Sequence, residues 1–146
     1  MPTHPDDVRR RIPLDEIQLQ VVFGSLLGDA MLVGDAGARR LRVVHAADRL
    51  PYATWKYERL GALVAVAPRV TGAVVTFETV AHPVFDDLAH LFYRDRTRPR
   101  MKAVRRDAVL ARLTPLGLAV WMSDVGRLQL RADSFIPAQE ALALTA

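Results

Sequence analysis

The chain has 146 residues, of which 51% are hydrophobic and 25% charged, a balance typical of one soluble globular domain. It contains no cysteine, so disulfides, thiolate metal sites and cysteine nucleophiles are excluded. The formal net charge is +4, and neither a signal-peptide core nor a membrane-spanning apolar run is found, so we expect a cytoplasmic protein with a basic surface.

The first 13 residues carry three prolines and mixed charge, and we expect a flexible arm. A helix is predicted to begin at Asp15 and Glu16, because acidic residues in a first turn favour the helix dipole. Residues 21–28 are almost all apolar or glycine, which predicts burial on more than one side. Asp29 follows at the C-terminal end of this helix.

A β-hairpin is predicted from residues 31–33 and 40–45, joined by a glycine-containing turn. In its second strand Arg40 and Arg42 alternate with Leu41 and Val43, so the apolar side chains should face the core and the guanidinium groups the opposite side.

Apolar residues at helical spacing predict helices over residues 49–66 and 83–92. A second hairpin, residues 68–70 and 73–80, is expected between them, with Thr76 and Glu78 pointing away from the core. The order αββαββα indicates an α+β fold in which helices back one face of an antiparallel four-stranded sheet.

The second part of the chain begins with a basic segment that contains Arg94, Arg96, Arg98, Arg100, Lys102, Arg105 and Arg106. Such a run predicts either a phosphate-contacting surface or a solvated face in an arginine-rich protein. A short helix over residues 103–113 should follow, then a helix that starts at Thr114-Pro115 and ends at Gly126. One strand (residues 128–132) and a last helix complete the predicted order.

Two helices thus carry small residues and end at an acid, Asp29 in the first and Asp124 in the second. Carboxylates are costly beside buried apolar helices, so this repetition suggests two metal-binding acids that helix packing brings together.

The chain resembles the LAGLIDADG homing endonucleases whose single chains carry two motifs. Residues 24–29 (Gly-Ser-Leu-Leu-Gly-Asp) resemble the first motif, and residues 113–121 the start of the second. Further similar segments follow in the family's order, at residues 52–60, 79–92 and 133–135.

The resemblance implies Mg²⁺-dependent hydrolysis of phosphodiester bonds in double-stranded DNA, with Asp29 and Asp124 as catalytic acids. It implies Mg²⁺ bound by these two carboxylates and by main-chain oxygens near Gly28, and close packing of the motif helices through Gly24, Gly28 and Gly117. The implied DNA contacts are Arg40, Arg42, Arg69, Thr76, Glu78, Arg96, Arg98 and Lys102.

The resemblance also predicts four segments: an arm (residues 1–13), a complete LAGLIDADG half (14–93), a basic linker with a short helix (94–113), and a truncated second half (114–146). In the family the second metal ligand immediately precedes the motif's final glycine, a position that Val125 takes here. Valine cannot bind a cation, so Asp124 is expected to be a structural or solvent-facing acid unless the helix end rearranges. His45, His82 and His90 are expected to be surface or capping residues.

Three functions remain open at this stage. The chain is an endonuclease, a DNA-binding relative that has lost cleavage, or an RNA-binding helper of intron splicing. We expect a monomer, with a homodimer as the alternative.

Overall fold

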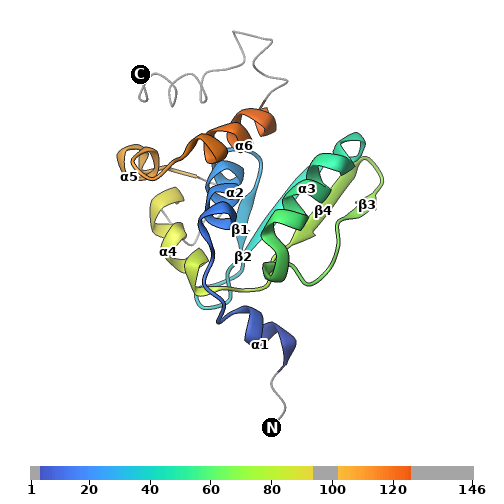
Figure 1. Cartoon of the computed structure of the whole chain (residues 1–146), viewed down its shortest axis with the longest axis horizontal. Helices are drawn as coiled ribbons and strands as arrows, with labels where there is room; N and C mark the ends of the chain where they lie inside the picture. The colour runs from blue at the N-terminus through green and yellow to red at the C-terminus, as the bar shows by residue number, and fades with distance from the viewer. Residues whose placement is uncertain (1–3, 94–101, 126–146) are drawn as a thin grey trace.

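The computed structural model describes residues 4–93 and 102–125 (Figure 1). Four strands and six α-helices make up this part of the chain, in the order α1 (Pro5–Arg9), α2 (Glu16–Leu27), β1 (Met31–Val33), β2 (Arg40–Ala46), α3 (Leu50–Leu60), β3 (Arg69–Thr71), β4 (Val74–Glu78), α4 (Pro83–Phe92), α5 (Arg106–Leu110) and α6 (Pro115–Val125). Short 3-10 turns flank α3, at Ala47–Arg49 and Gly61–Leu63. The predicted αββαββα order is confirmed.

The strands form one antiparallel sheet in the order β1-β2-β4-β3. In β2, buried and partly exposed residues alternate, with Leu41 and Val43 buried and Arg40 and Arg42 on the other face. Glu78 of β4 lies directly opposite Arg42. The sheet therefore has one apolar and one polar face, as its sequence period of two predicts.

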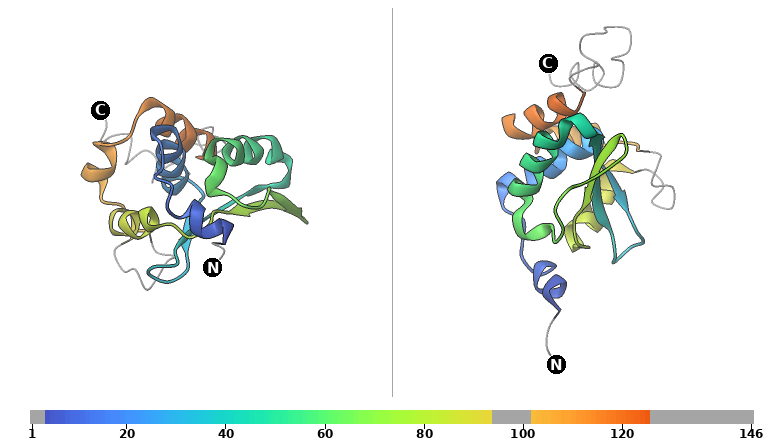
Figure 2. Two further views of the ribbon diagram at one scale, coloured as in Figure 1. Left: turned by 60° about the horizontal axis from the view of Figure 1, so that its bottom comes forward. Right: turned by 90° about the vertical axis from the view of Figure 1, so that its right-hand side faces the viewer.

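Helices α2 and α3 lie on the apolar face, and none of the helices in residues 4–93 and 102–125 lies across the opposite face of the sheet (Figure 2, right). The core between these layers is built from fully buried side chains such as Phe23 of α2, Leu41 of β2, and Phe85 and Phe92 of α4. The rings of Phe23 and Phe92 are 6.0 Å apart, so α4 closes the core from the side of α2.

Helix α6 packs along α2, and the two lie side by side (Figure 1). A methyl group on Gly24 would collide with the carbonyl oxygen of Gly117 and would come within 2.6 Å of the Cβ atom of Val120. Gln20 of α2 also fixes the position of the start of α6, because its Oε1 atom accepts a hydrogen bond of 2.9 Å from the backbone N–H of Thr114. The second motif helix is thus supplied by the same chain as the first.

Several element boundaries differ from the predictions, and the differences are clearest at α1, α3 and α5. Residues 5–9 form a short helix instead of a loose arm, since Pro5 stands at its first position and the His4 side chain accepts a hydrogen bond from the Asp6 backbone. Helix α3 ends at Leu60, because Gly61 has a φ of 54° and the chain turns there. Helix α5 starts only at Arg106.

The late start of α5 has a physical reason. The backbone of Ala103 donates to the carbonyl oxygen of Phe92 (2.9 Å), and that of Arg105 to Leu91 (2.7 Å), so this stretch runs extended beside the end of α4. The predicted strand at residues 128–132 and the last helix lie outside the described residues. Within the described ranges, no helix has the length and apolar character needed to span a membrane.

Candidate functional site

The two acidic residues that end the motif helices meet at one end of the α2–α6 pair. The backbone N–H of Asp29 donates a hydrogen bond of 3.1 Å to Oδ2 of Asp124. The Asp124 carboxylate also lies directly against Gly28, where any Cβ would collide with it. Asp124 therefore faces the first motif without any rearrangement, and Val125 instead joins the apolar residues around Trp121. The expectation that Asp124 needs a rearrangement of the helix end to reach the first motif is therefore wrong.

The carboxylate of Asp124 is already engaged inside the protein. Its Oδ1 atom lies 2.8 Å from Nζ of Lys56 and accepts a hydrogen bond of 2.6 Å from the hydroxyl of Tyr52. The side chains of Lys56 and Asp124 are both 0% exposed. Asp124 is therefore a buried structural acid, and the Lys56 ammonium is its counter-ion.

The pKa values around Asp124 follow from burial. Burial lowers the pKa of Lys56 from its usual value, while the attraction of Asp124 acts in the opposite direction. Burial also raises the pKa of the Tyr52 hydroxyl, and the neighbouring Asp124 carboxylate raises it further. Tyr52 thus keeps its proton and donates it to the carboxylate in a hydrogen bond.

Sequence reasoning did not identify Lys56 or Tyr52 as site residues, although one signal was available. Ala53, Lys56 and Leu60 are the buried residues of α3, and their spacing of three and four puts a lysine on the apolar stripe of a helix. A lysine in that place needs a buried anion, and Tyr52 lies one turn earlier on the same side.

Asp29 is the exposed acid of the pair, with 50% of its side chain accessible. Its pKa is raised, first by partial burial and then by the nearby Asp124 carboxylate. Its Oδ2 atom lies 3.8 Å from Nδ1 of His45, too far for a direct hydrogen bond.

His45 comes from β2 and points to the helix side of the sheet, under the ring of Tyr52. Its side chain is 1% exposed, and neither ring nitrogen has a hydrogen-bond partner among the described residues. Burial, together with the charge of Lys56, lowers its pKa to about 4, so the imidazole is neutral. His45 is therefore a buried residue of the site, which corrects its expected surface position; His82, by contrast, caps the start of α4.

Lys102 was expected to contact DNA phosphates, and the structure places its ammonium elsewhere. Nζ donates to the carbonyl oxygens of Leu26 (2.7 Å), Gly28 (3.3 Å) and Ala30, which lie in the last turn of α2 and the residues just after it. Burial lowers the pKa of Lys102 to about 8. Its charge is directed at the first motif and away from the exposed surface.

As arranged, these residues do not fit a divalent metal. Mg²⁺ needs a nearly octahedral shell of oxygens, and the main-chain oxygens at Gly28 and Ala30 already bind the Lys102 ammonium. Asp124 is held by Lys56 and Tyr52, which leaves Asp29 as the one accessible carboxylate of the predicted set. In the part of the chain that the structure describes, no group of three or more His, Asp or Glu side chains is placed to hold a metal.

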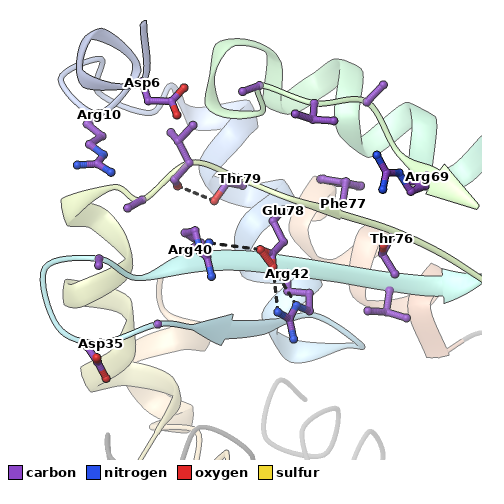
Figure 3. Close-up of a pocket in the computed structure, with 18 residues that line it drawn as sticks. Asp6, Arg10, Asp35, Arg40, Arg42, Arg69, Thr76, Phe77, Glu78 and Thr79 are labelled. Atoms are coloured by element: carbon purple, nitrogen blue, oxygen red, sulfur yellow. Dashed lines mark hydrogen bonds and ion pairs between the residues drawn. The ribbon is translucent and has the colours of Figure 1, made fainter. Parts of the chain in front are cut away.

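The open face of the sheet forms a second candidate site. It is hollowed by a cavity of about 1020 Å³ whose lining includes five residues expected to contact DNA, namely Arg40, Arg42, Arg69, Thr76 and Glu78 (Figure 3). The Glu78 carboxylate lies 3.0 Å from the guanidinium of Arg42 and 3.6 Å from that of Arg40. Arg96 and Arg98 lie outside the described residues.

The polar face carries charged and polar side chains of the kinds that contact nucleic acid. Arg40 and Arg42 side chains are each 43% exposed, so they are ordered by Glu78 and still accessible. Arginine can donate hydrogen bonds to guanine edges and to phosphates, and a carboxylate can accept one from the amino group of cytosine. The strand pair β2–β4 therefore presents both donors and an acceptor.

The fold resembles a solved structure described as the homing endonuclease I-WcaI bound to its DNA recognition sequence. The TM-score is 0.66, with 20% sequence identity over 83% of this chain and 62% of that chain. At this identity, the likeness concerns the fold.

Among curated proteins, the chain is similar to "Protein RecA" of Mycolicibacterium flavescens (32% identity over 123 residues), of Mycobacterium gastri (32% over 126) and of Mycobacterium shimoidei (30% over 122). Each match covers 82% of this chain and 28% of the relative, so the chain spans less than a third of those proteins. The family model described as "LAGLIDADG DNA endonuclease family" matches residues 19–140. With two motif helices packed through glycine and two acids at their shared end, the chain belongs to the LAGLIDADG DNA endonuclease family.

Proposed function

We propose that this chain binds double-stranded DNA through the polar face of its sheet. The observation that carries this proposal is the gathering of Arg40, Arg42 and Arg69 on the sheet face opposite α2 and α3, in a cavity that α1 borders through Asp6 (Figure 3). The related fold of I-WcaI, which is described as bound to its DNA recognition sequence, supports DNA as the partner of this chain. The basic residues Arg96 and Arg98 would add phosphate contacts.

We further propose that cleavage by this chain is impaired. Family membership argues for Mg²⁺-dependent hydrolysis of phosphodiester bonds, and the site geometry argues against an efficient form of it. The carboxylate of Asp124 is neutralised by Lys56 and closed off from solvent. A DNA-binding protein that cuts slowly or not at all agrees best with both observations.

DNA binding is tested by fluorescence anisotropy with a labelled random duplex in EDTA, over a range of salt concentrations. The double variant Arg40→Gln/Arg42→Gln should bind more weakly. The slope of log affinity against log salt should also fall, by about one for each phosphate that the protein no longer neutralises. Arg59→Gln is the matched control, because Arg59 is exposed on α3 and packs over Trp55. An unchanged slope in the double variant would remove the sheet face from the proposal.

Cleavage is tested by incubating the protein with a randomised plasmid library and Mg²⁺. We expect no double-strand breaks, or slow nicking at most, from a species that sediments as a monomer. The monomer is favoured because α6 of the same chain already occupies the surface of α2 that a second copy would need. Efficient double-strand breaks by a monomer would refute the proposed impairment.

A further inference from the structure

We propose that the ammonium group of Lys102 takes the place of a metal ion at the first motif. It occupies the main-chain oxygens that a divalent metal would need. A metal ion can then bind beside Asp29 only when the Lys102 ammonium withdraws. This inference rests on the proposed function, because it explains how a site with impaired cleavage excludes a metal ion.

The first argument is the fit between Lys102 and its acceptors. The last carbonyl groups of an α-helix have no partner within the helix and carry the negative end of the helix dipole. At the end of α2 the chain turns at Gly28, and the carbonyl oxygens of Leu26, Gly28 and Ala30 converge on one point. An ammonium group has three N–H donors, so these three oxygens satisfy it completely.

The second argument is that the backbone of Lys102 is fixed in this place. Lys102 forms an antiparallel bridge with Tyr93, and the next residue, Ala103, bonds to the carbonyl oxygen of Phe92 at 2.9 Å. The hydroxyl of Tyr93 accepts a hydrogen bond of 3.0 Å from the backbone of Leu32 in β1. The segment that carries Lys102 is therefore tied both to α4 and to the strand that follows the first motif.

The third argument is the balance of charge. Asp29 and Asp124 bring two negative charges, and Lys56, Arg49 and Lys102 bring three positive charges that all act on Asp29. With Lys102 in place, a divalent ion beside Asp29 would add positive charge to a site where cations already outnumber the two acids, and it would find the neighbouring carbonyl oxygens engaged.

The inference is tested with the isolated chain and with MgCl₂, CaCl₂ or MnCl₂ as the probe. For the wild type we expect no heat of binding in calorimetry and no rise in melting temperature at millimolar metal. Lys102→Met keeps the length of the side chain and removes its charge, so it should bind metal at least about tenfold more tightly and melt at a higher temperature when metal is added. Adding Asp29→Asn to Lys102→Met should abolish this gain.

Lys102→Arg is the matched control, because it keeps a cation at the same position and should remain insensitive to metal. A second measurement uses the wild type and so does not depend on whether a variant folds. In NMR spectra, Mn²⁺ bound at the first motif would broaden the amide signals of residues 28–30. Absence of broadening at submillimolar Mn²⁺ supports the inference.

Two results would overturn the inference. One is tight metal binding by the wild type that Asp29→Asn abolishes; the other is a folded Lys102→Met variant that binds metal no better than the wild type. Neither result bears on DNA binding through the sheet, which is measured in EDTA, and impaired cleavage is measured separately with the plasmid library. Failure of this inference can therefore be told apart from failure of either part of the proposed function.

Discussion

The Nζ atom of Lys56 lies 2.8 Å from Oδ1 of Asp124, and neither side chain reaches solvent. The pair joins the middle of α3 to the last turn of α6, and the hydroxyl of Tyr52 strengthens the same link. A buried ion pair contributes little net stability compared with apolar residues, but removal of one partner leaves an uncompensated buried charge. The second acid of the motif has thus become part of the packing between helices.

We predict that Asp124→Asn destabilises the protein by about 3–5 kcal/mol, the usual cost of breaking a buried pair from one side. Urea unfolding measures this change. The double variant Lys56→Met/Asp124→Asn should lose less stability than the sum of its single variants, because it leaves no buried charge behind. Asp35→Asn, at an exposed turn, is the control and should stay within about 0.5 kcal/mol of the wild type. Additive effects would show that the two side chains do not compensate each other.

Local sequence signals specified most of the fold. The capping box formed by Asp15 and Gln18 starts α2, Pro115 starts α6, and the alternation in β2 fixes which face of the sheet is apolar. These signals act over a few residues, so a single sequence displays them. Element ends were less certain, because α3 stops where Gly61 allows a positive φ, inside a run of apolar residues.

The site could be predicted only in part, because its contacts are long-range. Asp29 and Asp124 were recognisable from the repeated motif, but Lys56 is 68 positions from Asp124 in the chain and only tertiary packing joins them. Lys102 stands among arginines in a basic run, and charge pattern alone does not distinguish a lysine that turns inward from one that faces solvent.

We predict that Gly24→Ala destabilises the α2–α6 contact. The added methyl group would collide with the carbonyl oxygen of Gly117 and the side chain of Val120. Overpacking of this kind costs about 1–3 kcal/mol, which exceeds the helix propensity that alanine gains over glycine. Ser25→Ala in the next position is the control, since the Ser25 hydroxyl is buried with no hydrogen-bond partner among the described residues, and this change should be neutral or stabilising. Thermal unfolding of both variants gives the comparison.

We predict that Glu78→Gln strengthens non-specific DNA binding. The carboxylate of Glu78 neutralises Arg42 and Arg40 and would itself repel phosphates. Its removal should therefore tighten binding to a random duplex and steepen the salt dependence, measured by anisotropy in EDTA. The stability should change by less than about 1 kcal/mol, because the pair is partly exposed. Weaker binding in this variant would mean that Glu78 itself contacts the bases.

The last prediction concerns His45 and acid. Its folded-state pKa of about 4 lies below the ordinary value of 6.5, so the unfolded chain binds a proton more readily than the folded chain. The stability that this residue contributes is complete above pH 6.5 and is lost as the pH falls toward 4, by about 3 kcal/mol at most for a shift of this size. Asp29, whose pKa is raised in the folded state, acts in the opposite direction and reduces the loss.

His45→Gln should flatten the dependence of unfolding free energy on pH between 6.5 and 4, as measured by urea titrations at several pH values. Besides the ring of Tyr52, the groups that face His45 are Asp29, Asp124, Lys56 and Arg49, and all four remain in the variant. His90→Gln, at an exposed position of α4, is the control for the removal of a histidine. If His45→Gln kept the full wild-type slope, the buried imidazole would have to be protonated in the folded protein, with Asp29 and Asp124 as its counter-ions at 3.8 and 3.9 Å.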